Sequence, residues 1–105
     1  MFLTSGVASK PRAFWGAYAV SKAGLEALAA TYADEVDNTP VRVALINPGG
    51  VRTRMRAEAM PGEDPLTLPS PEAIAPLILE LARADREPPT GVVNYRDWAA
   101  RGAAA

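Results

Sequence analysis

Tyr18 and Lys22, four residues apart, are the side chains of this sequence best suited to acid–base chemistry. On a helix, residues at this spacing project from the same face, one turn apart. A nearby ammonium stabilises a phenolate, so such a pair can give and take a proton without a histidine. The alternative is a helix-surface pair in which the tyrosine ring simply packs, because the same spacing also occurs by chance.

Histidine and cysteine are both missing from the sequence. Ser-His-Asp and Cys-His catalytic arrangements are therefore excluded, together with thiolate metal sites and the commonest zinc ligand. We predict no metal site, and acid–base catalysis has to use other groups.

Two further groups could complete a site. Ser5 stands thirteen positions before Tyr18, at the end of a predicted strand, where its hydroxyl could bond to the oxygen that Tyr18 protonates. The alternative for Ser5 is a capped turn. The second group is the run Asn47-Pro48-Gly49-Gly50-Val51-Arg52-Thr53, which follows another predicted strand. Open α/β sheets bind ligands at this edge, although Pro-Gly is also an ordinary turn.

Strands and helices alternate along the chain and would position these groups. We expect, in order, a strand at 1–4, a long and substantially buried helix at 15–36, a strand at 41–46, a loop at 51–69 with one helical turn at 55–60, a helix at 70–84 and a short strand at 90–95. This alternation predicts parallel strands joined by helical crossovers. The fold class is therefore α/β, as one half of a doubly wound parallel sheet.

Local signals support the boundaries of these elements. The β-branched, apolar stretch 41–46 is typical of a strand that is covered on both faces. Ser70 followed by Pro71 is a good helix start, and we expect Pro76 to kink or delay the first turns. We expect one domain over residues 1–98 and a disordered, alanine-rich tail at 99–105.

Composition and charge favour an ordinary globular domain. The 105 residues are 49% apolar and 22% charged, and the net charge is −1. This balance gives no basic footprint for nucleic acid or an anionic membrane, and no apolar run approaches the roughly 20 residues that span a bilayer. With no signal-like leader, we predict a cytoplasmic location.

Three motifs in register resemble the second half of the short-chain dehydrogenases/reductases. They are Thr4-Ser5-Gly6, then Trp15-Gly16-Ala17-Tyr18-Ala19-Val20-Ser21-Lys22-Ala23, then Asn47-Pro48-Gly49-Gly50-Val51-Arg52-Thr53. The family places a serine about thirteen residues before the tyrosine of a Tyr-x-x-x-Lys motif. A Pro-Gly-x-x-x-Thr segment then follows the next strand. The resemblance covers roughly residues 1–95 and is closest to bacterial oxidoreductases.

The resemblance implies a Rossmann-like fold and NAD(P)-dependent transfer of hydride between an alcohol and a carbonyl. Tyr18 would be the acid/base, Ser5 would position the substrate oxygen, and Lys22 would stabilise ionised Tyr18 and bind the nicotinamide ribose. The nicotinamide would lie against four residues, with Tyr18 and Lys22 beside it: Pro48, Gly49, Val51 and Thr53. Residues 54–69 would form the substrate loop.

The family's Gly-rich pyrophosphate turn, Thr-Gly-x-x-x-Gly-x-Gly, occurs nowhere in the sequence. The residue that separates NAD from NADP would follow that turn, so the cofactor preference stays open. We therefore expect a partial domain whose first strand exposes an apolar edge. The alternative to an enzyme is a non-catalytic fragment that at most binds a partner or a second copy. Family members pair through the tyrosine helix, which makes 15–36 the expected oligomer surface.

Overall fold

Three short parallel strands form the centre of the chain. The computed structural model describes residues 1–83 and 91–102. The strands are β1 (Phe2–Leu3), β2 (Leu45–Asn47) and β3 (Val92–Asn94), in the order β1-β2-β3. Phe2 lies opposite Leu45, and Ile46 lies opposite Val93. The parallel α/β architecture predicted from the sequence is confirmed.

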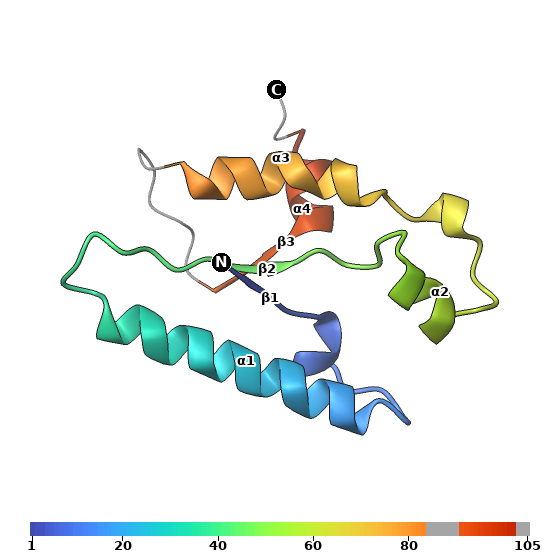
Figure 1. Cartoon of the computed structure of the whole chain (residues 1–105), viewed down its shortest axis with the longest axis horizontal. Helices are drawn as coiled ribbons and strands as arrows, with labels where there is room; N and C mark the ends of the chain where they lie inside the picture. Colours follow the sequence, from blue (N-terminus) through green and yellow to red (C-terminus); the bar gives the residue numbers. More distant parts are fainter. Residues whose placement is uncertain (84–90, 103–105) are drawn as a thin grey trace.

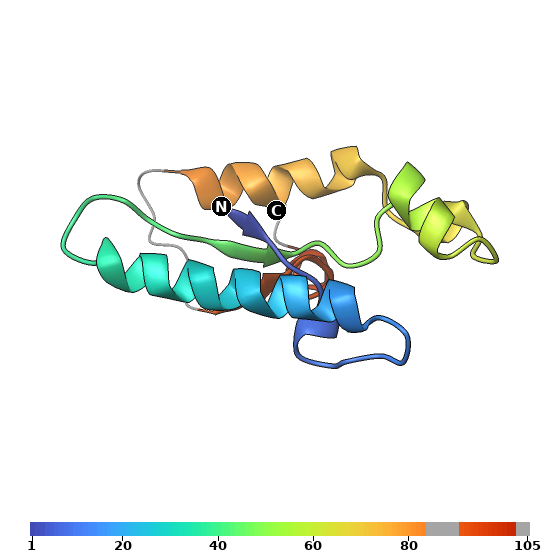
Figure 2. The same ribbon diagram turned by 60° about the horizontal axis from the view of Figure 1, so that its bottom comes forward.

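Helices cover both faces of this sheet. The elements between the strands are η1 (Gly6–Ala8), α1 (Gly16–Glu35), α2 (Arg54–Ala59), η2 (Pro65–Thr67) and α3 (Pro71–Ala82). Figures 1 and 2 show α1 on one side of the strands and α3 on the other. The carboxyl ends of the parallel strands share one edge, so the segments that follow β1 and β2 begin there.

The core lies between the sheet and α3. Ile46 and Leu77 are fully buried and form a cluster with Val93 and Trp98. Trp98 belongs to α4 (Tyr95–Ala100), and its indole Nε1 donates a hydrogen bond to Glu80 Oε2 at 2.6 Å. Apolar packing holds β2, β3, α3 and α4 together, and one partly buried hydrogen bond joins α3 to α4.

Helix α3 starts where the sequence predicts. Ser70 Oγ accepts a hydrogen bond from Ala73 N at 3.3 Å, and Pro71 occupies the first helical position. The prediction that Pro76 delays the start of the helix is wrong, since the helix begins at Pro71 and continues through Pro76. Pro76 removes only its own N–H, which would bond four residues back, and the capped first turn is independent of that bond. The helix ends at Ala82, and residue 84 of the expected range lies outside the described residues.

Two other expectations need correction. β2 begins at Leu45 rather than at residue 41: within the described residues its pairing with both β1 and β3 starts at Leu45, and strand propensity alone does not make a ladder. The last strand ends at Asn94, and residues 95–100 form α4, so Ala99 and Ala100 are helical rather than part of a disordered tail. Trp98 anchors this helix in the core, a tertiary contact with no local signal. Residue 90 and residues 103–105 lie outside the described residues.

Helix α1 is far less buried than expected. Within the described chain, Ala29 is the one buried residue of α1, while Val20 and Leu28 are 73% and 58% exposed. The helix packs mainly against η1 and β1. In the described part of the chain, no helix is long and apolar enough to cross a membrane.

Candidate functional site

Tyr18 and Lys22 lie on one face of α1, as the spacing predicts. The Lys22 Nζ atom is 5.7 Å from the centroid of the Tyr18 ring and donates a hydrogen bond to the Leu3 carbonyl at 3.0 Å. The Tyr18 ring also meets the Trp15 ring edge to face, with centroids 5.8 Å apart. The ammonium is therefore held between the end of β1 and the tyrosine.

Ser5 lies two residues after the end of β1 and is the N-cap of η1. Its Oγ accepts a weak 3.4 Å hydrogen bond from Val7 N, which is the capped turn that the sequence left as the alternative. A serine hydroxyl that accepts a hydrogen bond still has its own proton to donate. Within the part of the chain that the structure describes, no hydrogen bond joins Ser5 to Tyr18. The two residues are brought to the same region by the packing of η1 on α1.

A second polar contact fixes α1 on β1. Thr4 is 4% exposed, and its Oγ1 donates a 2.6 Å hydrogen bond to Glu26 Oε2. Glu26 is four residues after Lys22, so it lies on the same face of the helix. The sequence analysis missed Glu26, although a third polar residue at this spacing was a readable signal. Leu3 and Thr4, the two residues before Ser5, are thus both bonded to the helix that carries Tyr18.

The turn after β2 is held by asparagine side chains. Asn47 Oδ1 accepts a hydrogen bond from Gly49 N at 3.0 Å, and Gly49 has a φ of +72°. Asn47 Nδ2 donates to Asn94 Oδ1 at 3.0 Å, which ties the turn to the end of β3. A Cβ atom on Gly6 would lie 3.8 Å from Asn47 Nδ2, so η1 and this turn are neighbours. The structure therefore brings both sequence motifs to one edge of the sheet.

The other predicted nicotinamide-binding residues of this run are Pro48, Val51 and Thr53. Pro48 and Val51 are half-buried, and Thr53 is exposed. Thr53 is the N-cap of α2, and its Oγ1 accepts a hydrogen bond from Arg56 N at 3.1 Å. Its hydroxyl proton stays available for a ligand. Asn94 was not predicted as part of the site, and the signal for it was an asparagine at the end of each of two neighbouring strands.

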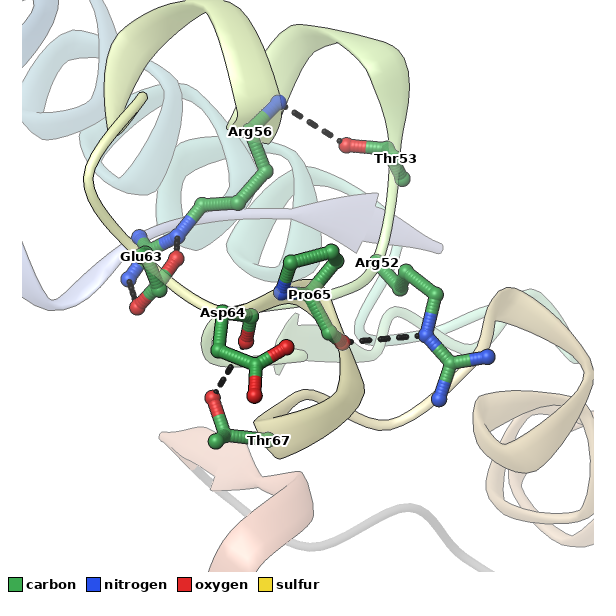
Figure 3. Close-up of polar contacts among 7 residues, drawn as sticks. All are labelled: Arg52, Thr53, Arg56, Glu63, Asp64, Pro65 and Thr67. Carbon is green, nitrogen blue, oxygen red and sulfur yellow. Dashed lines mark hydrogen bonds and ion pairs between the residues drawn. The ribbon is translucent and has the colours of Figure 1, made fainter.

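The loop at 51–69 is closed by hydrogen bonds from Arg52. Its backbone N–H donates to the Pro69 carbonyl at 2.8 Å, which joins the two ends of the loop. Its guanidinium donates to the carbonyls of Pro65 and Leu68 at 3.0 and 3.1 Å. Figure 3 shows Arg52 reaching across to Pro65. This irregular segment therefore has a defined, self-packed shape typical of functional surface loops.

Arg56 and Glu63 form the strongest polar contact in this loop. Arg56 Nε and Nη2 donate to the two carboxylate oxygens of Glu63 at 2.8 and 2.9 Å (Figure 3). Their side chains are 28% and 24% exposed. The hydrogen bonds from Arg56 hold the pKa of Glu63 below its ordinary value, and Glu63 raises the pKa of Arg56. The sequence analysis missed this pair, because a separation of seven residues in an irregular loop has no periodic signal.

Comparisons with known proteins agree with these motifs. A family model described as short chain dehydrogenase matches residues 1–64. The uncharacterized oxidoreductase YciK of Escherichia coli (strain K12) is 47% identical over 92 residues, which are 88% of this chain and 36% of that protein. This chain therefore spans about a third of its curated relative.

Two solved structures are also similar. A short chain dehydrogenase from Salmonella enterica serovar Typhi superimposes with a TM-score of 0.82 and 47% identity, over 89% of this chain and 39% of that one. A short chain dehydrogenase from Escherichia coli CFT073, complexed with NADPH, gives a TM-score of 0.77 and 41% identity over the same shares of both chains.

Proposed function

The chain belongs to the short-chain dehydrogenase/reductase family, and from that membership we propose that it supplies the proton-transfer and nicotinamide-binding residues of an NADP(H)-dependent oxidoreductase. The substrate class is an alcohol or the corresponding carbonyl compound. Because the chain spans 36% of its curated relative, this activity is proposed for the protein to which these residues contribute.

One observation carries the proposal. Lys22 Nζ lies 5.7 Å from the ring centroid of Tyr18 and is bonded to the Leu3 carbonyl, two residues before Ser5. The bond to Leu3 uses one of the three ammonium protons, so two are left for ribose hydroxyls. The hydrogen-bonded ammonium and the phenol that would exchange the proton therefore lie together on one face of α1.

The turn after β2 has the properties that a nicotinamide site requires. A Cβ atom on Gly49 would meet no atom within 4 Å, so the backbone there is open to a flat ring. Thr53 has a hydroxyl proton available for the oxygen of a carboxamide, and half-buried Pro48 and Val51 offer apolar surface beside it. The residues present therefore fit the group. The complex of a 41% identical relative with NADPH favours NADP(H) as the cofactor.

The proposed mechanism divides the work among three side chains. When bound, the nicotinamide supplies or accepts the hydride. Tyr18 Oη gives its proton to the substrate oxygen in reduction and takes it back in oxidation. Ser5 Oγ donates a hydrogen bond to that same oxygen and stabilises the charge that develops on it. Lys22 donates a hydrogen bond to the ribose and places a positive charge near the Tyr18 ring.

The test is a titration of the purified chain with NADPH and with NADH, followed by nicotinamide fluorescence. We expect saturable binding of NADPH that weakens by about tenfold in Lys22→Ala, because a charge-assisted hydrogen bond to ribose is lost. Tyr18→Phe is the matched variant that keeps the ring and removes the hydroxyl. Absence of binding to a demonstrably folded chain would count against a nicotinamide site formed by these residues on their own.

A second candidate is an oligomerising module without catalytic activity. It is favoured by the exposed apolar side chains of α1, namely Val20, Leu28 and Tyr32, which are 73%, 58% and 40% exposed. A second copy that packs on α1 would cover them.

The predicted lack of nucleic-acid and membrane partners and the predicted cytoplasmic location rest on composition and stay predictions.

A further inference from the structure

We propose that Arg56 is a positioning residue. Its ion pair with Glu63, which we call the latch, holds the 51–69 loop against Gly50, so that this loop and the proposed nicotinamide turn move as one unit. The inference rests on the proposed function only for the identity of the ligand that the turn binds. The latch itself is a property of the loop and is tested separately.

The geometry of the pair distinguishes it from an ordinary surface ion pair. Arg56 makes two hydrogen bonds to Glu63, with both side chains about one quarter exposed. Arg54 and Glu58, in the same short helix, approach to 3.4 Å with side chains 94% and 71% exposed. A paired fork that is partly withdrawn from water is directional and costly to break, whereas an exposed single contact contributes little.

Gly50 connects the latch to the turn. A Cβ atom on Gly50 would lie 3.2 Å from Arg56 Cζ and Nη2 and 3.1 Å from Leu68 Cδ2. The guanidinium and Leu68 therefore rest directly on the backbone of Gly50, and no side chain separates them from it. Gly50 follows Gly49, whose φ of +72° shapes the turn. Displacement of Arg56 would thus expose the turn and free the loop at the same time.

Arg52 holds the end of the 51–69 loop that leads into α3. Arg52 bonds to the carbonyls of Pro65, Leu68 and Pro69, which fixes the end of the loop near α3. Arg56 fixes the middle of the loop through Glu63. With both attachments in place, α2 and η2 are held as one body beside the turn; Figure 3 shows the contacts of Arg52 with Pro65 and of Arg56 with Glu63. The substrate loop is thereby preorganised before any ligand binds.

Amide hydrogen exchange of the loop tests the latch without a cofactor. The reporters are the amides of Met60, Glu63 and Leu66, which donate to Arg56 O, Met60 O and Asp64 Oδ1. We expect Arg56→Ala and Glu63→Gln each to speed their exchange by about tenfold, with no further increase in the double variant. Glu63→Gln keeps the side-chain volume, so it stays informative where Arg56→Ala does not fold.

Two further variants sharpen the test. Arg54→Ala, which breaks the exposed pair, should leave exchange of the reporter amides within about twofold of the parent chain. Gly50→Ala should speed exchange with both latch residues intact, because the added methyl group displaces the guanidinium or Leu68. Unchanged exchange in Arg56→Ala and Glu63→Gln, or an equal increase in Arg54→Ala, would overturn the latch. An NADPH titration of the parent chain then judges the proposed function independently, because the exchange result does not depend on it.

Discussion

Thr4 and Glu26 show how a single hydroxyl can fix the position of the helix that carries Tyr18. We predict that Thr4→Val, which keeps the shape and removes the hydroxyl, lowers the free energy of unfolding by about 1–2 kcal/mol. Glu26→Ala should cost a similar amount, and the double variant should cost little more than either single variant. Urea unfolding of the four chains gives the coupling energy. Strictly additive losses would show that the 2.6 Å contact contributes nothing to stability.

Gly49 and Gly24 should respond to alanine in opposite directions. Gly49 has a φ of +72°, so Gly49→Ala is strained and should destabilise the chain by about 1–2 kcal/mol. Gly24 lies within α1, where an added Cβ meets no atom within 4 Å. Gly24→Ala should therefore stabilise the chain by about 0.5–1 kcal/mol. Urea midpoints check both signs, and a stabilising Gly49→Ala would contradict the turn geometry.

Among individual residues, those with a local periodic signal could be predicted from the sequence. Tyr18 and Lys22 share a helix face because they are one turn apart, and the structure has them so. Ser70 caps α3 as expected, since a cap is also a local feature. Contacts between distant segments had no such signal. The bond between Asn47 and Asn94 spans 47 positions and depends on the pairing of β2 with β3.

At the scale of elements, the 51–69 loop should respond to acid through Glu63. Its pKa is lowered in the folded chain, mainly by hydrogen bonds from Arg56, so its stabilising effect is complete above the ordinary pKa of 4.5. The effect is lost as the pH falls through the lowered folded value. The hydrogen bonds to Glu63 raise the pKa of Arg56, so Arg56 keeps its charge throughout this acid range.

We therefore predict that amide exchange in the 51–69 loop, corrected for its intrinsic pH dependence, speeds up as the pH falls below the ordinary glutamate pKa of 4.5. Glu63→Gln should show the fast exchange already at neutral pH and lack this acid transition. An identical transition in Glu63→Gln would assign it to other carboxylates.

Some boundaries of the helices and strands could be predicted from the sequence, and others could not. The positions of the long helix, the turn after β2 and the start of α3 follow from proline, glycine and capping residues. The length of β2 does not, because it depends on pairing with β1 and β3, which are distant in sequence, and in the described residues that pairing starts at Leu45. Helix α4 was missed for a related reason: Trp98 makes it stable by packing in the core, and its six residues have no helical period of their own.

For the whole molecule, the exposed face of α1 predicts self-association. Leu28 is 58% exposed on α1, and Leu79 is 69% exposed on α3. We expect Leu28→Lys to shift the chain toward monomer in sedimentation velocity, because it places a charge among the exposed apolar side chains of α1. Leu79→Lys is the matched control and should leave the distribution unchanged. Equal shifts in both variants would indicate nonspecific association.

The central claim is that Tyr18, Lys22 and the turn after β2 together bind nicotinamide. The most direct test is a titration of the isotope-labelled chain with NADPH, followed by backbone amide chemical shifts. We predict concentration-dependent shifts at Gly49, Val51 and Thr53, and none at Ala44, on the amino side of β2. Shifts confined to other parts of the chain, or no shifts in a folded chain, would contradict the account.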